Sequence, residues 1–301
     1  MLYISRAAFL SFLLFILSLH VRAADNSSPA FWEIKQGKAT VYLFGSMHFG
    51  HADFYPLPDA VEKAFEVSDR LVVEVDILNI TPEAAVQAIF KYGGLPAGQQ
   101  LVNRLTPETF QTLAEQARKN GLDVKVFERF QPWYVSLMLV EAEIRKTELQ
   151  QKLGIDWYFL QRAGASKKVE ELESIDSQLA LFGGLTDADQ EEFLRQTLKD
   201  LVHSRAYLTA MAESWRKGDL ASLEATLIEP FQQKPQTQNL FNRIFIQRNV
   251  SMVDRILAYL KKNDQVFFVV GVSHMLGKGG IVALLEERGV QVRRISNPLL
   301  P

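Results

Sequence analysis

Two stretches of this chain decide its fold and its candidate site, because they share one pattern. Val41–His48 has the sequence VYLFGSMH, and Val266–His274 has the sequence VFFVVGVSH. Each is a run of β-branched and aromatic residues followed by Gly, two further residues and His, so each predicts a buried strand that ends in a Gly-x-x-His motif. The Gly lets the backbone turn without a Cβ clash. Both histidines then lie just past the carboxyl end of a strand, where open α/β sheets bind their ligands.

The rest of the chain predicts strand-rich ends around a helical middle. A β-hairpin is expected from Phe31 to Phe44, and three further strands are expected at 71–75, 168–172 and 290–295. Thr-Pro pairs at 81–82 and 106–107 are typical of helix starts, with Thr as the cap and Pro in the first turn. A site shared by both motifs requires their strands to be neighbours. We therefore expect one α/β domain over residues 24–301, with a helical lid inserted at about 81–238.

The N-terminal segment has the pattern of a secretory signal peptide. Arg6 precedes the apolar run Ala7–Leu19, and Val21 and Ala23 offer small residues before a cleavage point after Ala23. The apolar run is too short for a stable membrane span, although an uncleaved N-terminal anchor is the alternative. The signal peptide, residues 1–23, predicts an exported, periplasmic protein with no stable membrane span after cleavage.

Composition narrows the class of protein further. The chain has no Cys, so disulfides and a lipid attached to Cys are excluded, and the exported fold must be held by its core. Without the two arginines of the signal segment, 31 basic residues stand against 35 acidic ones, a net charge of −4. Without a basic block, this balance argues against nucleic-acid binding. The partner we expect is a peptide or a small-molecule substrate, and the sequence specifies no oligomeric state.

His48, Glu74 and His274 are the leading candidates for chemistry. Histidine transfers protons near neutral pH and is the commonest metal ligand. Glu74 interrupts the apolar strand 71–75, and an ionised group inside a sheet is costly unless it is paired. Two His and one carboxylate also form a ligand set for a catalytic divalent metal (Mn, Co or Zn) with an open position for water. We expect all three side chains to face a wet cleft.

Two further charged residues have weaker signals. Glu173 follows the short expected strand 168–172, but it lies in an acidic cluster that also suits a solvated surface. Arg248 lies in an expected helix over about 240–262 that also carries Arg243 and Arg255, and this spacing alone favours a surface position.

Several other kinds of active site do not fit the sequence. It contains no Gly-x-Ser-x-Gly elbow, no Cys nucleophile and no His-Glu-x-x-His helix. Gly277–Gly280 only partly matches a phosphate-binding loop, and its glycines are explained more simply by a tight turn into the next helix. If the protein is a hydrolase, water is therefore the expected nucleophile.

Taken together, these motifs resemble the TraB/GumN family, which includes the Tiki-type metalloproteases. The resemblance covers nearly all of residues 24–301 and rests on both Gly-x-x-His motifs, on Glu74 and on several short patterns, namely Gly154-Ile155-Asp156, Leu172-Glu173-Ser174, Trp215 and Arg248-Asn249. It implies an α/β fold with a central mixed sheet from two related halves and an inserted, mainly helical region. In the Tiki branch the two His and the Glu are regarded as a metal site. The similar erythromycin-esterase fold implies metal-free hydrolysis that also uses an Arg, which falls here on Arg248.

The sequence therefore predicts an exported, metal-dependent hydrolase of amides or esters. Water is activated at the metal ligands His48, Glu74 and His274, and Glu173 or Arg248 supports the transition state. Two alternatives remain open. One is a metal-free hydrolase in which a His, oriented by Glu74, is the general base. The other is a periplasmic protein that binds a ligand or peptide without turnover.

Overall fold

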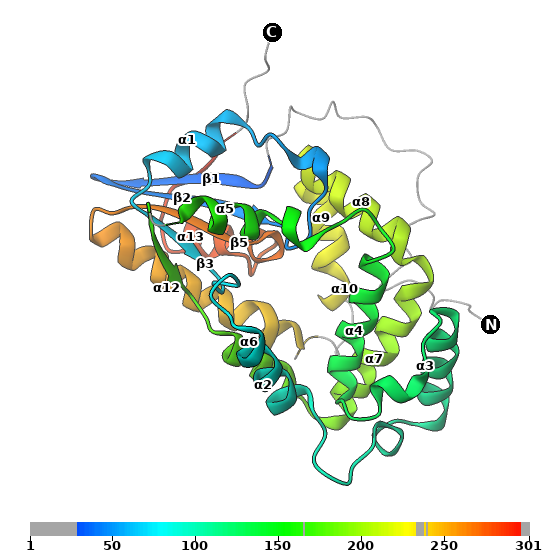
Figure 1. The fold of residues 1–301 in the computed structure, drawn as a ribbon. Coiled ribbons are helices and arrows are strands. Elements are labelled where there is room, and N and C mark those ends of the chain that lie inside the picture. The colour runs from blue at the N-terminus through cyan, green and yellow to red at the C-terminus, as the bar shows by residue number, and fades with distance from the viewer. Residues whose placement is uncertain (1–28, 165, 233–237, 239, 296–301) are drawn as a thin grey trace, which may run out of the picture. The chain divides into compact units, whose positions relative to one another are not determined.

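The computed structural model describes residues 29–164, 166–232, 238 and 240–295. The expected signal peptide therefore lies outside the described residues, as do residues 233–237 of the Pro- and Gln-rich stretch 230–238. The described residues divide into two compact units. We call residues 29–79, 149–172 and 209–295 the sheet unit, and residues 80–148 and 173–208 the helical unit (Figure 1).

The sheet unit contains one six-stranded mixed sheet in the order β4-β3-β5-β2-β1-β6. Four strands, β4, β3, β5 and β2, run parallel, while β1 is antiparallel to both of its neighbours. This confirms an α/β fold with a central mixed sheet. The strands are β1 (Phe31–Gln36), β2 (Ala39–Ser46), β3 (Arg70–Val73), β4 (Lys168–Glu171), β5 (Gln265–Gly271) and β6 (Val292–Arg294).

The two strands that carry the Gly-x-x-His motifs are neighbours, as the argument from a shared site requires. β2 and β5 pair in parallel over seven residues, with Gly45 opposite Val270 and Ser46 opposite Gly271. β3 pairs with the other edge of β5, so β5 lies between β2 and β3. The predicted hairpin is also present, and its turn uses Gly37 at a φ of +60°, a left-handed conformation that favours glycine.

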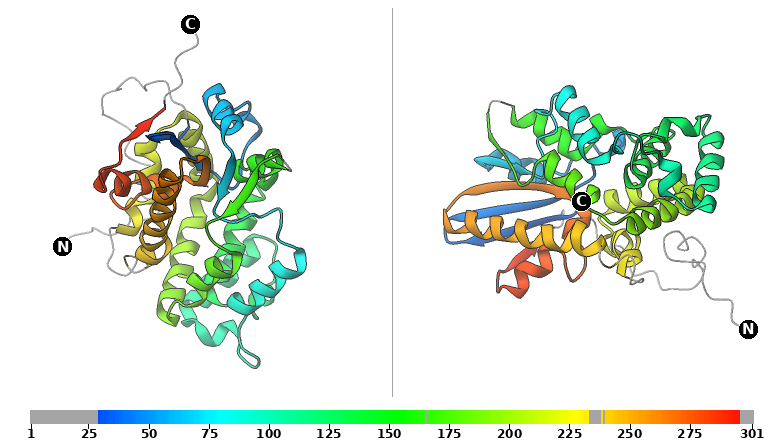
Figure 2. Two further views of the ribbon diagram at one scale, coloured as in Figure 1. Left: turned by 90° about the vertical axis from the view of Figure 1, so that its left-hand side faces the viewer. Right: turned by 90° about the horizontal axis from the view of Figure 1, so that it is seen from below.

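Helices cover both faces of this sheet (Figure 2). α12 and α13 lie on one face, and α1 and α5 lie on the other. The aromatic rings of Phe44, Phe65, Phe159 and Phe267 pack against one another inside this core. The helices of the sheet unit are α1 (Asp59–Val67), α5 (Ile155–Ala163), α9 (Leu220–Leu227), α10 (Glu229–Gln232), α12 (Gln247–Lys261) and α13 (Ile281–Glu287), with the short helices η1 (Ala52–Phe54), η4 (Gln151–Leu153), η6 (Asn242–Ile246) and η7 (Val272–Met275).

The helical unit has a buried hydrophobic cluster of its own. Leu101, Leu113, Val135 and Leu194 are almost completely buried in it. Both predicted Thr-Pro starts are confirmed, because Thr81 and Thr106 each accept a hydrogen bond from a backbone N–H of the helix that follows. Its elements are α2 (Pro82–Gly93), α3 (Pro107–Lys119), α4 (Pro132–Ile144), α6 (Ile175–Gly183), α7 (Asp187–Asp200) and the short helices η2 (Leu101–Arg104), η3 (Val124–Phe127) and η5 (Leu201–His203); α8 (Ser204–Lys217) begins in it and ends in the sheet unit. A lid role for these helices stays a prediction.

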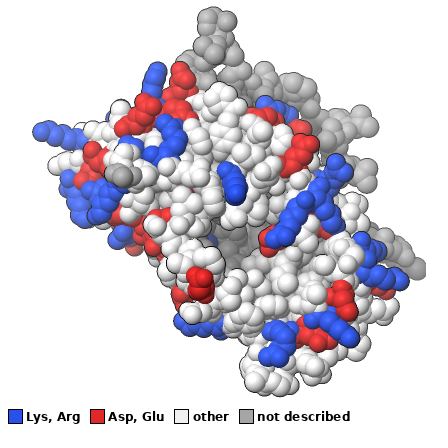
Figure 3. All heavy atoms as spheres, viewed as in Figure 1, with Lys and Arg blue, Asp and Glu red and all other residues white. Residues whose placement is uncertain are grey.

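The surface carries charges of both signs. On the described part of the face in Figure 3, Lys and Arg side chains lie among Asp and Glu side chains. Among the described residues, no helix is both long and apolar enough to cross a bilayer.

Candidate active site

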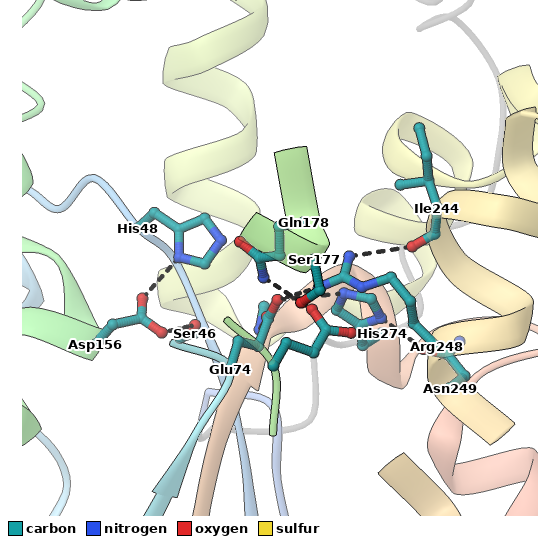
Figure 4. Close-up of polar contacts among 12 residues, drawn as sticks. Ser46, His48, Glu74, Asp156, Ser177, Gln178, Ile244, Arg248, Asn249 and His274 are labelled. Carbon is teal, nitrogen blue, oxygen red and sulfur yellow. Dashed lines mark hydrogen bonds and ion pairs between the residues drawn. The ribbon is translucent and has the colours of Figure 1, made fainter. Parts of the chain in front are cut away.

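Three candidate side chains follow three neighbouring parallel strands. His48 comes two residues after the end of β2, Glu74 directly follows β3, and His274 lies in η7, directly after β5. Because the carboxyl ends of parallel strands meet at one edge of a sheet, this order places all three at the same edge. Figure 4 shows them gathered there, with Arg248 from α12 beside them.

Gly271 marks the point where these side chains meet. A Cβ atom at this position would lie 3.3 Å from Glu74 Oε1, 3.7 Å from His274 Cδ2 and 3.7 Å from His48 Nε2. The φ of Gly271 is −49°, which any residue can adopt, so its backbone makes no left-handed turn. The Gly of the second motif therefore lets the side chains of the site approach the backbone closely. The sequence had suggested that this Gly gives the backbone freedom to turn.

Glu74 is a buried anion held by several donors. Its Oε1 accepts a 2.6 Å hydrogen bond from the Gly271 N–H, and its Oε2 lies 2.6 Å from Arg248 Nη2. Only 8% of its side chain is exposed. Burial alone would raise the pKa of Glu74, but His274, His48 and Arg248, together with the Gly271 N–H, lower it to about 2. Glu74 is therefore ionised at neutral pH and is a weak base.

Arg248 reaches Glu74 from a helix that contains one irregular turn. Within the helix expected over about 240–262, residues Asn242–Ile246 form a π-helical turn, η6, and the helix continues as α12. Single π-helical turns occur frequently at functional sites. Arg248 Nη1 donates to the Ile244 carbonyl of this turn at 3.1 Å, while Nη2 meets Glu74 (Figure 4). Its side chain is only 12% exposed, so the surface position that the spacing favoured is wrong.

His48 is fixed by a carboxylate that the sequence analysis assigned no role. Its Nδ1 lies 2.9 Å from Asp156 Oδ2, and Asp156 Oδ1 accepts a 2.9 Å hydrogen bond from Ser46 Oγ. Attraction to Asp156, opposed by burial, raises the pKa of His48 above its ordinary value of 6.5. The His48 side chain is nevertheless 61% exposed, so water reaches it and screens part of that attraction.

A glycine brings Asp156 to His48. The Ile155 N–H donates to the Met47 carbonyl at 3.0 Å, which ties the start of α5 to the end of β2. A Cβ atom at Gly154 would lie 2.1 Å from the His48 carbonyl oxygen, an overlap that no side chain tolerates. Gly154 therefore permits the close approach that places Asp156 in the first turn of α5 beside the imidazole.

We expect Gly154→Ala to loosen this contact. The added methyl group must push α5 away from His48, and such overpacking typically costs about 1–3 kcal/mol of unfolding free energy. Urea unfolding of the wild-type and variant proteins measures this loss. An unchanged unfolding free energy would show that α5 does not approach His48 so closely.

His274 is held by the side-chain amide of Asn249. Its Nδ1 lies 2.5 Å from Asn249 Oδ1, and Asn249 Nδ2 donates to the Gly279 carbonyl at 2.7 Å. His274 Nε2 faces Glu74 Oε2 at 3.7 Å, and only 4% of the His274 side chain is exposed. Of the three candidates that were expected to face a wet cleft, Glu74 and His274 are buried, whereas the His48 side chain is exposed.

The structure brings four of the five candidates together, namely His48, Glu74, Arg248 and His274. Glu173 is the first residue of the second segment of the helical unit, and it accepts a 3.0 Å hydrogen bond from Gln178 Nε2. Its role at the site stays a prediction. Asp156 and Asn249 also belong to the site and were not predicted, although both lie in the short patterns on which the family resemblance rests.

A divalent metal fits this site only in part. Both imidazoles place Nδ1 against an acceptor, as metal-binding histidines do. The two oxygens of Glu74, however, already meet the Gly271 N–H and the Arg248 guanidinium. Among the described residues, no three His, Cys, Asp or Glu side chains are grouped so that they could hold a metal ion. In this arrangement the residues do not form a metal site.

Comparison with known protein families and proteins identifies a matching family and several similar proteins. The family model described as the TraB/PrgY/gumN family matches residues 30–294. The chain is 28% identical over 268 residues to the uncharacterized protein YbaP of Escherichia coli K12, covering 88% of this chain and 95% of the relative. It is 24% identical to the metalloprotease TIKI homolog of Amphimedon queenslandica, covering 93% of this chain and 64% of the relative.

A vertebrate protein is similar at the same level. The metalloprotease TIKI2 of Xenopus tropicalis is 24% identical and is matched over 90% of this chain and 60% of its own length. The chain therefore spans less than two thirds of the length of these two metalloproteases. Comparison with the solved structures gives no significant match.

Proposed function

Because this chain belongs to the TraB/PrgY/gumN family, which places it beside named metalloproteases, we propose that it is a hydrolase of amide or ester bonds. The observation that carries the proposal is the convergence of His48, Glu74 and His274 on Gly271. A structural role accounts poorly for it, since packing alone does not require two imidazoles and an anion to meet at one point.

His48 is the proposed general base. Glu74 is too weak a base, because its pKa is about 2, and His274 is almost completely buried. His48 is exposed, and a neutral imidazole there accepts a proton from water as the water attacks the substrate carbonyl. Asp156 stabilises the imidazolium ion that forms, and the cation of Arg248 supports the negative charge that develops on the carbonyl oxygen.

Metal-dependent hydrolysis is the second candidate. The similarity to two metalloproteases and the Nδ1 partners of both imidazoles favour it. The ligands would be His48, Glu74 and His274, and Mn, Co or Zn would lower the pKa of a water molecule. Such a site requires Glu74 to turn away from Arg248 or Gly271.

The deciding experiment measures the metal content of the purified protein together with its peptidase and esterase activity, before and after chelation. Under the first proposal, activity survives the removal of metal. Loss of activity on chelation, with recovery on adding Mn, Co or Zn, would favour the metal-dependent candidate. Measurable binding with no turnover across substrate panels would instead support a ligand- or peptide-binding protein.

The pH dependence of hydrolysis is a further prediction. Because the base must be neutral and Asp156 raises the pKa of His48, kcat should increase as the pH rises through that elevated pKa. Asp156→Asn removes the attraction and should move the increase to lower pH. Rate profiles of both proteins from neutral to alkaline pH test this. An increase at the same pH in both would contradict His48 as the base.

Export belongs to the same proposal. The signal peptide of residues 1–23 would deliver the hydrolase to the periplasm. Mass measurement of protein from the periplasmic fraction should find a chain that begins at Ala24. An intact Met1 in the membrane fraction would contradict export with cleavage.

A further inference from the structure

Each imidazole of the site has its own acceptor for Nδ1, supplied by a different helix. Asp156 of α5 meets His48, and Asn249 of α12 meets His274 (Figure 4). We infer that Asp156 and Asn249 are positioning residues that hold both histidines as the Nδ1–H tautomer, with Nε2 directed toward Gly271 and Glu74. The inference rests on the proposed function, because the positioning of the histidines serves hydrolysis. The tautomers themselves can be measured without any substrate.

The Asp156 contact can be read in only one way. An ionised carboxylate accepts hydrogen bonds and cannot donate them, so the hydrogen in the 2.9 Å contact belongs to His48 Nδ1. Ser46 Oγ donates to the other carboxylate oxygen and thereby fixes the plane of Asp156. The opposite ring nitrogen, Nε2, then lies 3.7 Å from the Cβ position of Gly271.

The Asn249 contact is settled by a third group. An amide side chain can present either oxygen or nitrogen, so its contact with His274 alone would be ambiguous. The Gly279 carbonyl removes this ambiguity, because it accepts at 2.7 Å from Nδ2 and leaves Oδ1 toward His274. His274 Nδ1 is therefore the donor at 2.5 Å, and Nε2 faces Glu74.

The simpler explanation is that these buried polar groups only satisfy one another's hydrogen bonds. That explanation does not require the two imidazole rings to face the same place. Asp156 and Asn249 belong to helices on opposite faces of the sheet, yet both rings approach one glycine, because His48 Nε2 and His274 Cδ2 each lie 3.7 Å from the Cβ position of Gly271. Partners of this kind fix the tautomer and the orientation of histidines that act through Nε2.

The test is a measurement of the imidazole tautomers by long-range proton–nitrogen NMR of the full chain labelled with 15N-histidine. Spectra are recorded in chelator at a pH above the pKa of both imidazoles, and His48→Gln and His274→Gln variants assign the signals. Wild-type protein should contain both residues as the Nδ1–H tautomer. The opposite tautomer at either residue would overturn the inference without any positioning variant.

Three substitutions extend the measurement. Asp156→Asn offers an N–H to His48 Nδ1 and should shift that ring to the Nε2–H tautomer. Asn249→Leu removes the acceptor for His274 and should release its tautomer, whereas the matched Asn249→Asp keeps an acceptor and should retain it. His51, whose Nδ1 contacts Asp53, is the internal control and should not change. Tautomers that stay the same in Asp156→Asn and Asn249→Leu would overturn the inference.

Measurements of hydrolysis distinguish a failure of this inference from a failure of the proposed function. Where hydrolysis is found, Asp156→Asn and Asn249→Leu should lower kcat/KM by about 10–100-fold, as loss of such partners typically does. Full activity despite an altered tautomer would overturn the positioning role. Correct tautomers in a wild-type protein that hydrolyses nothing would support the positioning and contradict the hydrolase.

Discussion

Replacing His48 by asparagine is expected to lower kcat for hydrolysis about a hundredfold or more, the usual effect of losing a general base. Asparagine places an amide N–H near the position of Nδ1, so the buried Asp156 carboxylate can keep a donor while Nε2 is lost. Since the His48 side chain is 61% exposed, its loss leaves no large cavity, and the unfolding free energy should change by less than about 1 kcal/mol. Kinetics beside urea unfolding measure both effects.

His51→Asn is the matched control for this experiment. His51 lies three residues further along the chain and also places Nδ1 on a carboxylate, that of Asp53, at 2.6 Å. Its substitution should leave kcat unchanged. If His48→Asn kept wild-type activity, or lost activity only in proportion to its folded fraction, His48 would not be the base.

Replacing Glu74 by alanine is expected to destabilise the protein strongly. The change leaves the guanidinium of Arg248 in a buried site without its carboxylate, and breaking one side of a buried ion pair typically costs about 3–5 kcal/mol. The Gly271 N–H loses its acceptor as well. Urea unfolding of the wild type and the variant gives the difference in unfolding free energy.

Two comparisons identify the cause of that loss. The double variant Glu74→Ala, Arg248→Met removes both charges and should recover much of the stability, because an apolar replacement of a buried pair is often neutral. Asp254→Ala breaks an exposed pair with Arg288 and should cost less than about 1 kcal/mol. A cost of that small size for Glu74→Ala would contradict a buried pair with Arg248.

The sequence was sufficient to predict the frame of the candidate site. The apolar runs before Gly45 and Gly271 predict strands, and β2 and β5 are indeed adjacent and parallel. The run in β5 is buried on both faces of the sheet, and the run in β2 is buried except at the half-buried Tyr42, so the hydrophobicity of both runs is continuous and easily recognised. Glu74 was detectable because a charge next to such a run is costly unless it is paired.

The partners of the two imidazoles could not be predicted in the same way. Asp156 and Asn249 lie in helices, where polar residues face solvent by default, and the contacts that bury them join residues 108 and 25 positions apart. The π-helical turn before Arg248 was missed for a related reason. The expected helix was identified from its side-chain periodicity, which says little about one widened turn.

The position of β5 in the sheet has a consequence for protein synthesis. This strand is the fifth of the six described strands in chain order, yet it lies between β3 and β2. A nascent chain that ends before residue 265 can pair β1 with β2 and β3 with β4, but it has no strand to join the two pairs and no His274. Such a fragment would present unpaired edges on β2 and β3, and on β1 because β6 is missing too, and unpaired strand edges favour aggregation. A ribosome that stops early therefore releases a chain with no site, and correct assembly waits for almost the last strand to be made.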